Sequence, residues 1–303
     1  MIRLPILAVG LLIAFHQAAP PRFRTGVEVV RVNVLVTDGN RPVDGLTAAD
    51  FELKDSRVVQ EIEAATLADV PVSMALVLDT SESVKGATLK ELKSAAGAAI
   101  DGLGPADRVS LLTFSSAVQL EAGWTNSAKR VRDAIELAEA GGFTSLYDAT
   151  FTALLAGDTA SGNRQLVLVF SDGLDTASWL PRSAVIERGR RSEAVVYSVV
   201  LGGESYPRRL FRRSGVELLE PPVPASVVTP FLTELANTTG GTTFLAESPD
   251  GLRRLFARIV GEFRTRYLLT YTPRGVEKDG WHPIEVKLKN KNGKVTARRG
   301  YLR

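Results

Sequence analysis

Three oxygen-bearing side chains alternate directly after an apolar run in the first third of this sequence. The run Val72–Leu78 is followed by Asp79, Ser81 and Ser83. Successive side chains of an extended segment point to opposite sides, so this alternation directs all three toward one point. A carboxylate and two hydroxyls are hard oxygen ligands, which small divalent cations such as magnesium prefer. The segment is therefore a candidate part of a cation site.

Two further segments would complete such a site. Asp172 follows the apolar run Leu166–Phe170, and Thr144 follows a pair of glycines that let one loop approach another closely. The candidate ligands are then two carboxylates and three hydroxyls, from Asp79, Ser81, Ser83, Thr144 and Asp172. Each segment alone also has a purely structural explanation, since Asp and Ser cap helices and Ser-Asp-Gly forms turns. The occurrence of all three at strand ends of one sheet favours a metal site.

The elements that must position these side chains follow from the hydrophobic pattern of residues 71–264. Four runs are almost continuously apolar, as expected for parallel strands covered on both faces: Val72–Leu78, Val109–Phe114, Leu166–Phe170 and Val195–Leu201. Amphipathic segments with helical spacing lie between and after them, such as the stripe from Leu89 to Ile100. This alternation predicts an α/β fold with a doubly wound, mostly parallel sheet and helices on both faces.

The two ends of the chain have the period of half-buried strands instead. Val30, Val32, Val34 and Val36 alternate with more polar residues, and Ile284 to Leu288 alternates in the same way. Neither end supplies enough strands for a stable sheet alone. We therefore expect residues 20–70 and 265–303 to pair into a small, discontinuous, antiparallel, β-sandwich-like domain. The α/β domain, residues 71–264, would be inserted into it and would carry an irregular Arg- and Pro-rich loop at residues 202–228.

The five candidate ligands resemble, in type and order, those of the von Willebrand factor A domain. Asp79, Ser81 and Ser83 match its Asp-x-Ser-x-Ser motif, Thr144 its isolated threonine and Asp172 its distal aspartate, and the resemblance covers about residues 70–264. It implies a metal-ion-dependent adhesion site for Mg²⁺ or Mn²⁺, with the hydroxyls on the ion and the aspartates acting largely through water. An acidic group of a protein partner completes the coordination in that family. The whole chain further resembles exported von Willebrand A-related proteins of Acidobacteria.

The start of the chain has the layout of a secretory signal peptide. Arg3 precedes the apolar run Ile6–Phe15, and Ala18 and Ala19 follow it. We expect residues 1–19 to be removed and the protein to be exported, either periplasmic or secreted. An uncleaved N-terminal anchor stays open, because the residues just before the cleavage point are larger than is preferred. No later run is apolar enough to cross a bilayer, so the mature chain should have no membrane span.

Composition excludes several classes of site. The chain of 303 residues has 37 basic and 34 acidic side chains, and a net charge of +3 is too small to indicate nucleic-acid binding. The absence of cysteine excludes disulfides, thiolate metal sites and cysteine nucleophiles. Once the signal peptide is removed, His282 is the only histidine, and its place at the start of a predicted strand far from the metal edge favours a structural role.

These observations favour a non-enzymatic binding protein that holds a divalent cation and captures an acidic side chain of a protein partner. Arg208, Arg209, Arg212 and Arg213 either attract that partner or are ordinary solvated arginines. One alternative is a magnesium-dependent hydrolase, such as a phosphatase with Asp79 as nucleophile. Against it, Ser81 stands where such enzymes usually place a second acid, and no Walker loop is present. Another alternative is a structural envelope component with a vestigial metal site.

Overall fold

The computed structural model describes residues 29–39, 41–67, 70–157, 162–201, 210–213, 216–219, 230–246 and 251–303. The predicted signal peptide and most of the predicted Arg- and Pro-rich loop, Arg208 and Arg209 included, lie outside these residues. Within that loop, β11 (Leu210–Arg213) and β12 (Val216–Leu219) pair antiparallel, where irregular structure was expected. The apolar residues of these two segments have the strand preference that explains the difference.

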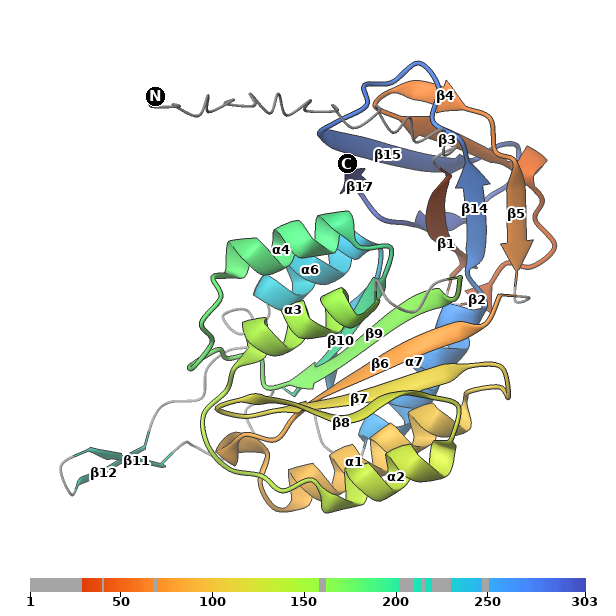
Figure 1. Cartoon of the computed structure of the whole chain (residues 1–303). Helices are drawn as coiled ribbons and strands as arrows, with labels where there is room; N and C mark the ends of the chain where they lie inside the picture. The colour runs from red at the N-terminus through yellow and green to blue at the C-terminus, as the bar shows by residue number, and fades with distance from the viewer. Residues whose placement is uncertain are drawn as a thin grey trace, which may run out of the picture.

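A six-stranded sheet forms the centre of the molecule (Figure 1). Its order is β13-β10-β9-β6-β7-β8, and every neighbouring pair is parallel except β7 with β8. The strands are β6 (Val72–Asp79), β7 (Arg108–Phe114), β8 (Val118–Thr125), β9 (Arg164–Ser171), β10 (Val195–Leu201) and β13 (Thr243–Ala246). All described residues of β6 and β9 are buried, as their continuous apolar runs predict.

Helices cover both faces of this sheet, each with its own hydrophobic core. One face carries α1 (Ala87–Asp101), α2 (Ala128–Leu137) and α7 (Leu252–Arg264), and the other carries α3 (Leu146–Gly157), α4 (Arg182–Arg191) and α6 (Pro230–Thr239). The predicted doubly wound α/β fold is therefore confirmed. The chain leaves β6 toward α1 and leaves β9 toward α4, so these two adjacent strands send their connections to opposite faces. Ligand sites of such sheets form at this kind of switch point.

Strands from the two ends of the chain pair with each other above the six-stranded sheet in Figure 1. One sheet has the order β16-β1-β14-β5 with β2 beside β1, and the other has the order β17-β15-β3-β4. The strands are β1 (Val30–Asp38), β2 (Arg41–Pro42), β3 (Phe51–Asp55), β4 (Val58–Gln60), β5 (Ala64–Leu67), β14 (Tyr267–Tyr271), β15 (Trp281–Leu288), β16 (Lys294–Thr296) and β17 (Gly300–Leu302), with a short 3-10 helix, η1, at Ala48–Asp50. Both sheets contribute to one shared core. We call these strands the β lobe and the six-stranded sheet with its helices the α/β lobe.

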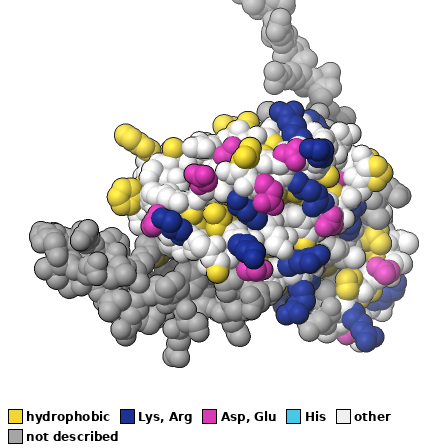
Figure 2. All heavy atoms as spheres, turned by 90° about the horizontal axis from the view of Figure 1, so that it is seen from below, with side chains coloured by type: hydrophobic (Ala, Val, Ile, Leu, Met, Phe, Trp, Pro, Cys, Tyr) yellow, Lys and Arg dark blue, Asp and Glu magenta, His cyan; other side chains and the backbone are white. Residues whose placement is uncertain are grey.

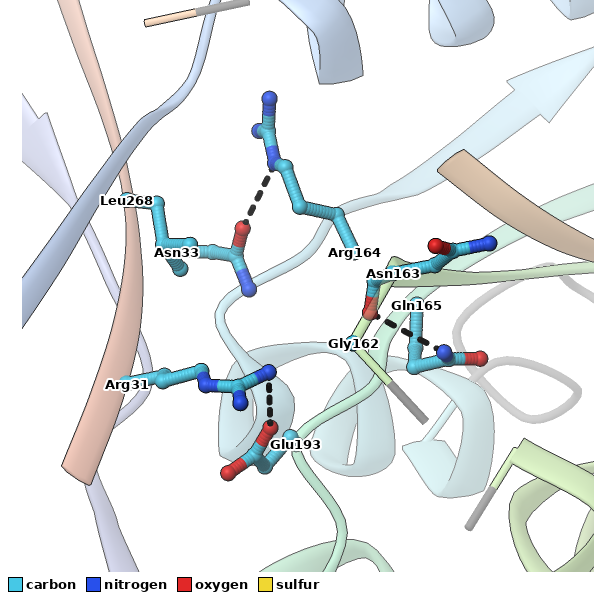
Figure 3. Close-up of a pocket in the computed structure, with 8 residues that line it drawn as sticks. All are labelled: Arg31, Asn33, Gly162, Asn163, Arg164, Gln165, Glu193 and Leu268. Carbon is cyan, nitrogen blue, oxygen red and sulfur yellow. Dashed lines mark hydrogen bonds and ion pairs between the residues drawn. The ribbon is translucent and has the colours of Figure 1, made fainter. Parts of the chain in front are cut away.

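Strand β1 is more buried than its sequence pattern predicts. Val32, Val34 and Val36 are buried as expected, but Asn33 and Leu35 on the other face are buried too. The α/β lobe covers that face: Nε of Arg164, at the start of β9, donates to Oδ1 of Asn33 at 3.2 Å (Figure 3). Contacts between lobes, which the local period of a strand cannot reveal, explain the difference.

His282 belongs to a buried polar cluster inside the β lobe. Its Nδ1 lies 3.0 Å from Oδ1 of Asp55, whose Oδ2 accepts hydrogen bonds from the hydroxyls of Tyr271 and Tyr301. These contacts join β3, β14, β15 and β17, which gives the histidine a structural position in the fold.

Among the described helices, none has the length and apolar character required to cross a membrane.

Candidate metal centre

The candidate site begins where β6 and β9 end side by side. Leu78 pairs with Phe170, which places Asp79 beside Ser171 at the carboxyl edge of the sheet. The Asp79 side chain is fully buried, and both of its oxygens accept hydrogen bonds. Oδ2 accepts from the hydroxyl of Ser171 at 2.7 Å, and Oδ1 accepts from the backbone N–H of Ser81 at 2.9 Å. The charge of Asp79 is thus held by neutral donors.

The two serines that follow Asp79 lie together. Ser81 is buried and immediately precedes the 3-10 helix η2 (Glu82–Val84), and Ser83 within that helix is half-buried. Their hydroxyl oxygens are 3.0 Å apart. Thr80, which lies between Asp79 and Ser81, donates its backbone N–H and its hydroxyl to the carbonyl of Phe114, the last residue of β7. These bonds hold the loop over the end of the sheet.

The segment that carries Thr144 runs alongside this loop. The N–H of Gly141 donates to the carbonyl of Thr80 at 2.8 Å, and the N–H of Glu82 donates to the carbonyl of Gly142 at 3.1 Å. Gly142 has a φ of +82°, and a Cβ there would lie 2.6 Å from the Ser116 hydroxyl. A side chain is therefore excluded on two grounds, which explains the glycine.

Thr144 is buried and tied to the segment that follows Asp172. Its N–H donates to the hydroxyl of Thr176 at 2.9 Å, and its carbonyl accepts from the N–H groups of Thr176 and Ala177. Asp172 is also buried, and its Oδ1 accepts from the N–H of Leu174 at 3.1 Å. The structure thus brings the segments of all five predicted ligands to one edge of the sheet, with Asp79, Ser81 and Ser83 joined by the bonds described above.

The two aspartates repel each other in this setting. Burial, and to a lesser extent the negative charge of Asp172, raise the pKa of Asp79 to about 7, while hydrogen bonds from Ser81 and Ser171 act in the opposite direction. A divalent cation would offset both unfavourable effects, since it supplies positive charge where burial and repulsion oppose the carboxylates. The residues present therefore fit a bound cation, because serine hydroxyls lie beside a buried carboxylate that has a second carboxylate as its neighbour.

The site depends on hydroxyls more than on acids. Among the residues that the structure describes, no group of three or more His, Cys, Asp or Glu side chains gathers in a way that could hold a metal. Neutral hydroxyl ligands leave a bound cation with more positive charge than an all-carboxylate site would. Such a cation keeps a strong attraction for a further anionic ligand.

The sequence did not reveal the contacts that support the site from outside. Ser171 holds Asp79, and the carboxylate of Asp148 accepts from the N–H groups of Trp179 and Leu180. Asp175 accepts from the N–H of Tyr147, at the start of α3. The Ser171 contact depends on the register of β6 against β9, for which the local sequence gives no signal.

Residues 74–174 match the family model of the von Willebrand factor type A domain. A search of the curated proteins gives no significant match. The matched segment contains all five candidate ligands, together with most of β6, all of β7, β8 and β9, and the helices between them.

Solved structures with the same fold share little sequence with this chain. A von Willebrand factor type A protein from Catenulispora acidiphila has a TM-score of 0.54 at 13% identity, over 88% of this chain and 76% of that one. The corresponding domain of the type V pili tip protein Mfa5 from Porphyromonas gingivalis has a TM-score of 0.52 at 12% identity, over 69% and 98%. Proximal thread matrix protein 1 from the mussel byssus, with a zinc-occupied MIDAS motif, has a TM-score of 0.52 at 15% identity, over 69% of this chain and half of its own.

The family match and the common fold point to the same kind of domain. Residues 74–174 of this chain match the von Willebrand factor type A domain, and the fold is that of solved type A domains.

Proposed function

We propose that this protein is a non-enzymatic binding protein whose activity depends on a divalent cation. Asp79, Ser81, Ser83, Thr144 and Asp172 hold Mg²⁺ or Mn²⁺, and the cation binds an Asp or Glu carboxylate of a protein partner. The observation that carries the proposal is the fully buried Asp79 carboxylate, which is held by hydroxyl and backbone donors beside a second buried aspartate. The zinc-occupied MIDAS motif of the mussel protein supports a metal at the equivalent place in this fold.

The same observation weighs against Asp79 as a catalytic nucleophile. A nucleophilic carboxylate needs a free oxygen directed at the substrate. Both oxygens of Asp79 accept hydrogen bonds, and the side chain has no exposure to solvent. Binding is the chemistry that this geometry favours.

The metal is tested by thermal unfolding with and without MgCl₂ or MnCl₂ after treatment with a chelator. At a cation concentration about 100 times the dissociation constant, we expect a gain near 2.7 kcal/mol, or several degrees in the unfolding midpoint. Asp172→Ala and Ser81→Ala should lose this gain. Asp133→Ala and Ser94→Ala, at exposed positions of α2 and α1, are matched controls that should keep it. If both site variants gain as much as the parent, the ion binds elsewhere.

Export and domain organisation complete the proposal. Residues 1–19 act as a secretory signal, and the protein functions in the periplasm or outside the cell, or stays anchored if the signal is not cleaved. The antiparallel pairing of β1 with β14 and of β3 with β15 supports one discontinuous domain, residues 20–70 and 265–303, with the type A domain inserted.

A further inference from the structure

The edge of the sheet that carries the candidate site also exposes two large aromatic side chains. Phe143 is 66% exposed and Trp179 is 93% exposed. Phe143 directly precedes Thr144, and Trp179 lies between β9 and α4. In Figure 2, hydrophobic side chains project at the left margin of the molecule, the end at which β6 and β9 finish in Figure 1.

The backbones of both aromatic residues are fixed relative to the site. Phe143 donates its N–H to the Ser116 hydroxyl at 2.9 Å, and Trp179 donates its N–H to Oδ2 of Asp148 at 2.9 Å. Thr144 is hydrogen-bonded to the segment that leads to Trp179. The two aromatic residues therefore belong to loops that are tied to the segment of a proposed cation ligand.

Exposed aromatic rings in such a position are suited to binding. Each ring buries about 150–250 Å² when it is covered, and tryptophan is enriched among the residues that dominate interface energies. Few rotatable bonds and a fixed backbone keep the entropic cost of ordering them low. Single exposed apolar side chains are common, but two aromatic ones beside the same candidate ligand loop are not explained by folding.

We infer that the partner segment bound at this site carries apolar side chains next to its acidic residue, and that these side chains pack on Phe143 and Trp179. The inference rests on the proposed function and specifies its ligand: a protein loop with an acidic residue between hydrophobic neighbours. The carboxylate would supply the attraction to the cation, and the apolar neighbours would distinguish this partner from the many acidic segments on protein surfaces. A carboxylate with close apolar neighbours is a feature of a peptide segment, which is why we favour a protein loop over a lipid surface.

The test uses three synthetic peptides and the full chain loaded with magnesium. The first peptide is acetyl-Gly-Leu-Glu-Phe-Gly-amide, the second replaces Leu and Phe by Ser, and the third replaces Glu by Gln. Affinities are measured by titration calorimetry or by NMR. The parent should bind the first peptide at least five times more tightly than the second and should not bind the third measurably.

Variants of the two aromatic residues separate this inference from the proposed function. Trp179→Ala and Phe143→Ala should bind the first two peptides with nearly equal affinity and still gain thermal stability from magnesium as the parent does. Leu155→Ala, at a 51% exposed position at the far end of α3, is the control and should keep the preference.

Different outcomes would overturn the aromatic contact alone or the proposed carboxylate capture as well. If the parent binds both acidic peptides equally, the aromatic contact is wrong and the proposed carboxylate site stands. If magnesium stabilises the protein but neither acidic peptide binds, or if the Gln peptide binds as well as its acidic counterpart, both the inference and the proposed carboxylate capture are wrong. Loss of vesicle binding or of self-association in Trp179→Ala, without any peptide preference in the parent, would assign the rings to a membrane or to a second copy.

Discussion

The surroundings of Asp79 do little to stabilise its ionised carboxylate. It has no exposed surface, its hydrogen-bond donors are neutral, and a second buried aspartate lies close enough to repel it. Such an arrangement costs stability in the metal-free protein. Proteins accept this kind of cost mainly at functional sites, where a ligand removes it.

The first prediction uses a substitution that removes this charge and keeps the shape. In Asp79→Asn, measured by urea unfolding in chelator at pH 8, we expect the free energy of unfolding to rise by about 1–3 kcal/mol, because the burial of charge and the repulsion disappear. The stabilisation by magnesium should vanish in the same variant. Asp148→Asn is the contrasting control, since its carboxylate accepts two backbone N–H bonds and its replacement should lower stability. A metal-free Asp79→Asn protein less stable than the parent would contradict the account of this site.

The candidate ligands could be proposed from the sequence because their signal is local. Alternation after an apolar run pointed to Asp79, Ser81 and Ser83, and the ends of two other segments pointed to Thr144 and Asp172. The supporting contacts were not predictable in this way. Ser171 and Asp148 act on residues that are distant in sequence, and only strand register and loop path bring them together.

Among the helices and strands too, those with a clear local sequence pattern were predictable and those that depend on distant contacts were not. The strands that are apolar throughout and the amphipathic helices of the α/β lobe have clear periods, and the fold follows from them. β8 and β13 were missed. Both lie at the edges of the sheet, where one side of a strand has no partner, and their burial is correspondingly irregular. Edge strands depend on pairing with the sheet more than on their own pattern.

The second prediction concerns two helical glycines with opposite surroundings. A Cβ at Gly261 in α7 would meet nothing within 4 Å, whereas a Cβ at Gly189 in α4 would lie 2.7 Å from Cδ1 of Leu235 in α6. We expect Gly261→Ala to raise the free energy of unfolding by about 0.5–1 kcal/mol through helix propensity. Gly189→Ala should lower it by about 1–3 kcal/mol, because the packing of α4 on α6 must open. The free energies of unfolding of the two variants and the parent are measured by denaturant unfolding. Equal changes in the two variants would show that helix propensity alone governs both sites.

At the scale of the whole molecule, the two lobes are joined by contacts that tolerate little change. Gly240, after α6, has a φ of +83°, and a Cβ there would lie 2.4 Å from the backbone nitrogen of Arg298 in the β lobe. Nη2 of Arg298 donates to the carbonyl of Arg190 in α4 at 2.8 Å, and Nε of Arg164 in β9 donates to Oδ1 of Asn33 in β1 at 3.2 Å. The backbones of the two lobes therefore meet closely at Gly240, and a displacement there would disturb the hydrogen bonds between the lobes.

Because the two lobes are in close contact at this junction, we predict that they unfold together in one cooperative transition. The parent should unfold in one transition that follows the same midpoint by far-UV and near-UV circular dichroism, and magnesium should shift that whole transition. Gly240→Ala forces the lobes apart and should lower stability well beyond the 1–2 kcal/mol that a left-handed alanine costs. Gly45→Ala supplies the matched control, because its φ of +72° is similar and nothing lies within 4 Å of the added Cβ. In Gly240→Ala we expect the transition to split, with magnesium shifting only the part that reports the α/β lobe. A Gly240→Ala protein that loses no more stability than Gly45→Ala and still unfolds in one step would mean that this junction does not couple the lobes.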